Sequence, residues 1–265
     1  MKKHTVSRMG LVVAVALFAW VNVASAAITQ SEPFDYNVGI HNSDASRTWP
    51  TMGTGSGYGW GGEWYNHVGA GYQFGIATGG HTGTFADSTS MNQLGANRER
   101  NLNPKRSGGV VSWYYVSISM RGTGTTSYIR GFNGNGYYIW GLGVRDTGFA
   151  FANGNGGTGT GISTHTASTD ATNPDVLVMK LTPTGGNFYD VAFWVNPTAA
   201  TEGDLPAPDG TVTGAKPGYG SPETAKIGWV AQLSQIDDIL CADAYEDLPL
   251  TTSSSGTAGT LIYGK

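Results

Sequence analysis

A segment between residues 110 and 121 places aromatic, hydroxyl and cationic side chains at alternating positions. Alternate residues of a β-strand share one face, so these side chains form one stripe, which consists of Trp113, Tyr115, Ser117, Ser119 and Arg121. The intervening residues form an apolar face that we expect in the core, made of Tyr114, Val116, Ile118 and Met120. Aromatic rings pack on sugar C–H faces, while hydroxyl and guanidinium groups supply hydrogen bonds. The stripe therefore predicts a ligand-binding surface, and the alternative is that a neighbouring loop such as residues 201–221 covers Trp113.

A second aromatic group lies in the glycine-rich stretch GSGYGWGGEWYNH, residues 55–67. Trp64 and Tyr65 are candidate ligand-binding residues, because sugar sites combine such rings with polar neighbours like Glu63. For Trp60 we favour the alternative, in which the ring covers one end of a β-sandwich core. We therefore expect the main role of this stretch to be structural, with ligand binding second.

Two carboxylates, Asp237 and Asp238, interrupt the apolar strand-like sequence QIDDILC. Alternation puts Asp237 on one face of the strand with Ile239 and Cys241. It puts Asp238 on the other face with Ile236 and Leu240, so both carboxylates lie on largely apolar faces. A buried ionised carboxylate must be paired, hydrogen-bonded or metal-bound. A metal site and a carboxylate that accepts backbone hydrogen bonds both satisfy this requirement.

Catalytic motifs are missing from the sequence. It contains no Gly-x-Ser-x-Gly elbow, no phosphate-binding loop and no His-Glu-x-x-His helix. The paired carboxylates of a jelly-roll glucanase, Glu-x-Asp-x-x-Glu, are also missing, and the nearest fragment is Glu202-Gly203-Asp204. The sequence therefore predicts a protein that is not an enzyme.

Glycine is abundant, with 41 in 265 residues, and only 13% of residues are charged, a composition typical of short strands joined by tight turns. We expect a hairpin that turns at residues 145–148 and a short helical turn at residues 91–100. Residues 201–221 are expected to form a long loop. Strand-like sequences occupy residues 109–120, 136–144, 147–152, 174–181, 188–196, 225–230 and 235–241. These features predict an all-β antiparallel two-sheet sandwich or jelly roll.

The first 26 residues have the basic start, short apolar run and Ala24-Ser25-Ala26 cleavage site of an export signal. We therefore expect a signal peptide at 1–26, one domain at 27–250, a polar tail at 251–265, and no membrane span after signal cleavage. Cleavage would remove three basic residues and change the net charge from −4 to about −7, which disfavours nucleic acid and anionic membranes as partners. The single cysteine, Cys241, is expected to be a buried thiol.

Several segments, in this order and spacing, resemble the concanavalin A-like (laminin-G-like) jelly-roll domains of secreted bacterial surface proteins. They are EPFDY (32–36), GWGGEW (59–64), SWYYVS (112–117), DVLVMK (175–180), FWVNPT (193–198) and QIDDI (235–239). The resemblance implies a jelly roll in which the Trp113 stripe lines the concave sheet. It also implies a structural calcium bound by Asp237, with Glu32 or carbonyl groups near residue 34 as further ligands. The superfamily contains lectins, glucanases and adhesive modules.

Together these observations predict a secreted or cell-surface protein that acts as a non-catalytic carbohydrate-binding or adhesive module. Its expected partner is a polysaccharide or a cell-surface glycan. The first alternative is a structural surface or matrix protein with no small ligand, and a glycoside hydrolase is the third.

Overall fold

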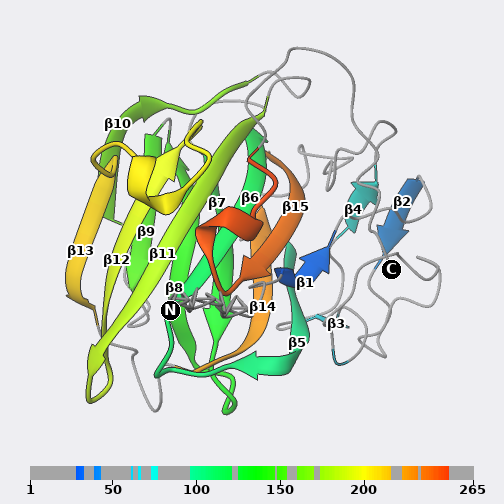
Figure 1. Ribbon diagram of the computed structural model, residues 1–265. Helices are drawn as coiled ribbons and strands as arrows, with labels where there is room; N and C mark the ends of the chain where they lie inside the picture. Colours follow the sequence, from blue (N-terminus) through cyan, green and yellow to red (C-terminus); the bar gives the residue numbers. More distant parts are fainter. Residues whose placement is uncertain are drawn as a thin grey trace, which may run out of the picture.

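The computed structural model describes residues 28–32, 39–42, 61, 65–66, 73–76, 96–120, 125–146, 148–153, 160–169, 174–215, 223–231 and 234–250. These residues form two facing β-sheets and a small separate ribbon (Figure 1). The six-stranded sheet has the order β1 (Ile28–Glu32), β15 (Ser234–Ala242), β6 (Ser112–Met120), β11 (Asp175–Gly185), β12 (Phe188–Val195) and β13 (Gly210–Ala215).

The seven-stranded sheet forms the second layer. Its order is β10 (Thr160–Thr166), β9 (Gly148–Asn153), β8 (Tyr138–Asp146), β7 (Thr125–Phe132), β14 (Thr224–Ala231), β5 (Ala96–Arg106) and β3 (Tyr65–Asn66). The ribbon pairs β2 (Gly39–Asn42) with β4 (Gln73–Ile76). All of these strand pairs are antiparallel. The predicted all-β two-sheet sandwich is confirmed.

The main core lies between the two sheets, and the alternation of residues along β6 predicted which side chains enter it. Tyr114, Val116 and Ile118 are buried there against apolar side chains of the opposite sheet, as expected. Those opposite side chains include Ile129, Trp140, Leu142, Val144, Phe149, Phe151 and Ile227. Cys241 is also fully buried in this core, which confirms its expected environment.

A glycine allows one of the largest core residues to pack. A Cβ atom on Gly131 would lie 2.2 Å from Nε1 of Trp140, so only glycine leaves room for the indole. That indole donates a hydrogen bond to Oγ1 of Thr224 (3.1 Å), which also accepts one from the Tyr114 hydroxyl (3.1 Å). The two bonds satisfy polar groups that would otherwise be costly to bury.

Two local expectations were wrong. Residues 96–100 belong to strand β5 rather than to a helical turn, because pairing with β14 and β3 overrides a polar sequence with no strand alternation. The expected loop at 201–221 contains the 3₁₀ helix η1 (Glu202–Asp204) and edge strand β13.

The hairpin between β8 and β9 is confirmed, with Arg145 opposite Gly148. Among the described residues, no helix is long and apolar enough to span a membrane.

Candidate functional site

The predicted ligand-binding stripe on β6 lies on the outer face of the six-stranded sheet, but that face is covered. The exposed fractions of the Trp113 and Tyr115 side chains are only 1% and 8%. The Trp113 ring stacks on Trp194 with a centroid separation of 5.7 Å and an interplanar angle of 28°. The centroid of the Tyr245 ring lies 5.2 Å from that of Trp113, with an interplanar angle of 59°. The expectation of an open, solvent-facing surface at Trp113 is therefore wrong.

The cover consists of two segments, residues 196–209 with η1 and residues 243–250 with η2 (Tyr245–Asp247). The Tyr245 hydroxyl donates to the carbonyl oxygen of Ala199 (2.9 Å), and Nε1 of Trp194 donates to that of Pro206 (2.9 Å). The two segments thus join over the sheet in a second apolar cluster. Its buried members are Trp113, Tyr115, Val178, Trp194, Leu240, Ala242, Tyr245 and Leu248.

The other stripe residues that the structure describes are also shielded from solvent. Ser117 and Ser119 are buried, and Arg121 lies outside the described residues. Alternation predicted the face on which these side chains lie but not the segments that cover it. Ligand contact by the stripe is untested and stays a prediction.

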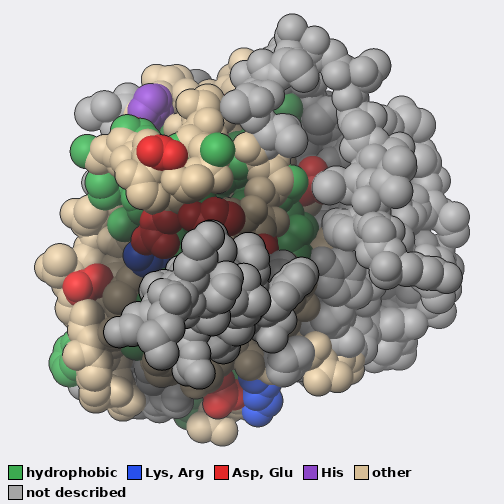
Figure 2. Space-filling model, in the orientation of Figure 1, with side chains coloured by type: hydrophobic (Ala, Val, Ile, Leu, Met, Phe, Trp, Pro, Cys, Tyr) green, Lys and Arg blue, Asp and Glu red, His purple; other side chains and the backbone are tan. Residues whose placement is uncertain are grey.

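Acidic side chains gather on the outside of the cover (Figure 2). Glu202, Asp243 and Glu246 are exposed there, and the Glu202 backbone N–H donates to Oε1 of Glu246 (2.8 Å). Lys180 forms an ion pair with Glu202, and its Nζ lies 5.4 Å from the centroid of the Trp113 ring. The cation therefore ties the acidic cover to the aromatic cluster below it.

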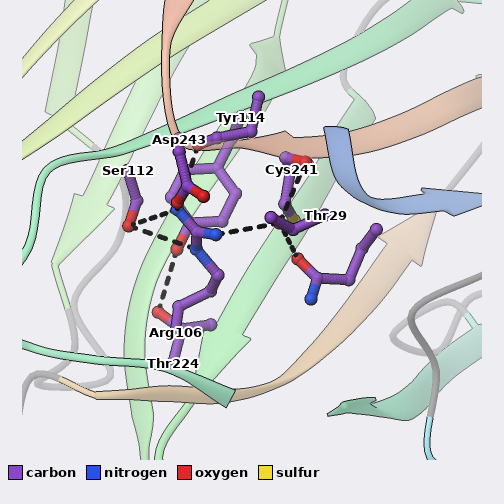
Figure 3. Close-up of polar contacts among 9 residues, drawn as sticks. Thr29, Arg106, Ser112, Tyr114, Thr224, Cys241 and Asp243 are labelled. Atoms are coloured by element: carbon purple, nitrogen blue, oxygen red, sulfur yellow. Dashed lines mark hydrogen bonds and ion pairs between the residues drawn. The ribbon is translucent and has the colours of Figure 1, made fainter. Parts of the chain in front are cut away.

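A buried arginine, Arg106, connects β5 to the six-stranded sheet (Figure 3). Its guanidinium donates to the hydroxyl of Thr29 (2.8 Å), to the Ser112 hydroxyl and to the carbonyl oxygen of Ala242 (3.0 Å). It also lies 2.6 Å from Oδ1 of Asp243. Because the donors of this guanidinium reach several strands and the cover, Arg106 has a structural role.

The predicted calcium ligands lie on neighbouring strands. Glu32 of β1 is opposite Ile239, two residues from Asp237 in β15, so the register is compatible with one shared cation. The side chains of Glu32 and Asp237 are outside the described residues. Within the described part of the chain, no three His, Cys, Asp or Glu side chains form a metal-binding group. Calcium binding stays a prediction.

The strict alternation expected along β15 is wrong. The pairing of β15 with β6 shifts register between Asp237 and Leu240, and Asp238 has a φ of +50°, as in a β-bulge. As a result Ile236, Ile239 and Cys241 all enter the core between the sheets. Burial raises the pKa of Asp238 to about 6.

The outer face of the seven-stranded sheet carries another aromatic residue. Tyr138 lies over Gly141, where a Cβ would be 2.2 Å from its hydroxyl oxygen, and the Arg130 guanidinium lies 5.2 Å from its ring centroid. Burial raises the pKa of the Tyr138 hydroxyl, so it stays protonated. Tyr128 and Ala150 beside it are buried, which makes this part of the face a packed cluster.

An exposed aromatic residue, Tyr137, is presented by the turn between β7 and β8. The side chain of Asn133 organises this turn, because its Oδ1 accepts hydrogen bonds from the backbone N–H groups of Asn135 (3.0 Å) and Tyr137 (2.9 Å). Gly136 has a φ of +80° and its N–H donates to the Asn133 carbonyl oxygen (2.9 Å). This matches a three-residue hairpin loop that needs glycine in the left-handed region. The Tyr137 side chain is 48% exposed on a well-defined turn.

Polar and charged groups surround this turn. Nζ of Lys105 lies 3.4 Å from the position of a Cβ on Gly134, and Nζ of Lys226 lies 3.9 Å from that on Gly136. Lys105 forms an ion pair with Glu223 at 3.3 Å. The turn thus combines an exposed ring with ammonium and carboxylate groups, and the exposed Asn135 adds an amide. The sequence-based predictions did not include this arrangement, although the tyrosine directly after the Asn-Gly repeat at residues 133–136 could have suggested it.

Of the aromatic residues in the 55–67 stretch, Tyr65 alone is among the described residues. Tyr65 lies in β3 opposite Glu99, and its side chain is outside the described residues. Trp60 and Trp64 also lie outside them. Their roles stay predictions.

Comparison with solved structures finds several distant similarities, and three of them are to different kinds of protein. The chain resembles the botulinum neurotoxin serotype C1 binding domain (11% identity, 80% of this chain and 50% of that chain, TM-score 0.38). It resembles an endo-β-1,4-glucuronan lyase from the fungus Trichoderma reesei (7%, 79% and 96%, TM-score 0.42) and the carbohydrate recognition domain of Emp46p (10%, 57% and 79%, TM-score 0.35).

The chain spans half the length of the botulinum domain that it matches. No family model matches the chain, and no curated protein matches it. All three TM-scores are below 0.5, so the assignment of a function rests on the chain itself.

Proposed function

We propose that this chain is an exported, non-catalytic carbohydrate-binding or adhesive module, and that the turn between β7 and β8 is its contact site. The observation that carries the proposal is the exposed Tyr137 ring, held on an ordered turn beside Asn135, Lys105 and Lys226. A sugar needs an aromatic face for its C–H groups and convergent polar groups for its hydroxyls, and this turn offers both. The expected ligand is a polysaccharide or a cell-surface glycan.

The turn is prepared for binding because its conformation is fixed before a ligand arrives. The hydrogen bonds to Asn133 Oδ1 hold the backbone on either side of Gly136, so little conformational entropy is lost when Tyr137 contacts a ligand. Tyrosine also has few side-chain torsions to restrict, which lowers the entropic cost further.

A glycan array with parallel assays for reducing-sugar release tests this function. The natural protein should bind at least one glycan without hydrolysing it. Tyr137→Ala should weaken that binding at least tenfold, while Tyr137→Phe, which keeps the ring, should retain most of it. The hydrogen bonds that close the turn use the backbone N–H and carbonyl oxygen of Tyr137, which both variants keep, so both should unfold at nearly the natural temperature.

The alternatives make different predictions in the same experiment. Absence of binding to every glycan on the array would favour a structural surface or matrix protein. Release of reducing sugar would reveal a glycoside hydrolase. Either result would overturn the proposal. Equal binding by the natural protein and Tyr137→Ala would move the site away from this turn.

We also propose a structural calcium ion at Glu32 and Asp237, supported by their closeness in the β1–β15 register. A cation there would compensate carboxylate charge at the sheet edge. Added calcium should raise the unfolding temperature of chelator-treated protein, and Asp237→Asn should abolish that increase. An unfolding temperature unaffected by calcium or chelator would contradict the site.

A further inference from the structure

Three large apolar side chains are exposed among the described residues, and each lies in a turn or directly beside one. They are Val110 (48% exposed), Tyr137 (48%) and Phe188 (44%), and we call their location the apolar end. The segments that carry them are rich in glycine and contain no Asp, Glu, Lys, Arg or His, with sequences SGGV (107–110), NGNGY (133–137) and TGGNF (184–188).

The register of the strands brings these turns to one end of the sandwich. Ser112, just after Val110, is opposite Leu181, close to where β11 turns back into β12 at Phe188. In the other sheet, β14 carries Thr224 opposite Arg106 and Lys226 opposite Phe132, so the β5–β6 and β7–β8 turns lie at the same end. Figure 1 shows these connections along its lower edge.

The spacing of the three side chains indicates the shape of what they contact. Val110 precedes β6 and Phe188 begins β12, and these strands lie on either side of β11, so the two residues are separated by two strand spacings, about 10 Å. Tyr137 belongs to the opposite sheet, about 10 Å further across. A single sugar ring does not span this triangle, whereas a ligand extended in two dimensions touches all three side chains.

We propose that the apolar end docks on the face of an insoluble polysaccharide. This inference rests on the proposed function and names its ligand class. A polysaccharide surface presents C–H groups next to hydroxyl groups. The apolar end matches that pattern, because the exposed residues Ser107, Asn135, Thr184 and Asn187 provide neutral hydrogen-bonding groups beside the apolar side chains.

The same neutral groups argue against a lipid bilayer as the partner. Hydrocarbon would remove water from the turn backbones and from Asn135 and Asn187 without replacing their hydrogen bonds. Attraction to anionic lipid is also weak here, since the lysines placed beside the Tyr137 turn number only two, Lys105 and Lys226, and Lys105 is paired with Glu223. A hydrated solid surface can replace these hydrogen bonds.

The test is sedimentation of the full-length mature protein with microcrystalline cellulose and with chitin. Val110 and Phe188 are changed together to serine, which leaves Tyr137 in place. The double variant should retain its circular dichroism spectrum and bind the solid polymer at least tenfold more weakly than the natural protein. The matched control, Ala200→Ser with Ala207→Ser, alters exposed positions between β12 and β13 at the opposite end and should bind normally.

Parallel measurements separate failure of this inference from failure of the proposed function. If the array detects a soluble glycan but neither polymer binds the protein, or both polymers bind the double variant normally, the inference is wrong and the function stands. If neither array nor polymers bind, both fail.

Two further outcomes would name another partner and overturn the inference. One is sedimentation with phosphatidylcholine or phosphatidylserine vesicles that depends on Val110 and Phe188. The other is a dimer, detected by light scattering, that the double variant abolishes. Binding to either polymer that the double serine variant loses, with neither of these effects, supports the inference.

Discussion

Replacing Trp113 by alanine distinguishes a buried aromatic cluster from an open binding surface. The Trp113 side chain is 1% exposed and is enclosed by Trp194, Tyr245 and Lys180. Truncation removes its apolar burial and leaves a cavity that a sheet and two tethered segments can close only in part. Such deletions cost about 3 to 5 kcal/mol of unfolding free energy. That is a large share of the roughly 5 to 15 kcal/mol that stabilises a typical domain.

Urea unfolding followed by far-UV circular dichroism measures this loss, because it does not depend on tryptophan fluorescence. The midpoint should fall while the slope with urea stays nearly constant. Val110→Ala is the control, since truncation of that exposed side chain should change stability by less than about 0.5 kcal/mol. An unchanged midpoint for Trp113→Ala, together with at least a tenfold loss of glycan binding, would refute the covered face and restore the open stripe.

Three further perturbations test other parts of the fold. Gly131→Ala should cost about 2 to 4 kcal/mol in urea unfolding, because the new Cβ would displace the Trp140 indole, whereas a change below 0.5 kcal/mol would contradict that contact. Arg106→Leu should cost about 3 kcal/mol in the same assay, since it leaves Asp243 and buried hydrogen-bond acceptors without their cation; full stability would show that the network is dispensable. Burial raises the pKa of Cys241 to about 12, so its neutral thiol should not react with Ellman's reagent at pH 8 until urea is added; rapid reaction of the folded protein would show that the thiol is accessible.

Much of the fold could be predicted because local patterns reflect the geometry of a strand. The alternation in β6 correctly divided Tyr114 and Val116 from Trp113 and Tyr115. Strand β5 was missed because its polar sequence carries no alternation and its conformation depends on pairing with β14. Strand β13 was missed because an exposed edge strand does not require a regular apolar face.

The candidate site was harder to predict, since exposure is a property of the whole molecule. Alternation placed Trp113 on the outer face, but residues about 80 and 130 positions further along the chain cover it, through Trp194 and Tyr245. In contrast, the turn that presents Tyr137 is held by local hydrogen bonds that Oδ1 of Asn133 accepts, so its shape was encoded locally. Its exposure and its closeness to Lys105 became known only from the tertiary structure.

The sequence by itself determined the two-sheet class, the faces on which Trp113, Tyr114, Tyr115 and Val116 of β6 lie and the hairpin between β8 and β9, because these depend on the covalent geometry of neighbouring residues. Tertiary structure alone decided that one aromatic face is closed and that Val110, Tyr137 and Phe188 lie at the same end of the sandwich. Such features depend on register and long-range packing, and the bulge at Asp238 shows how one extra residue redirects a strand.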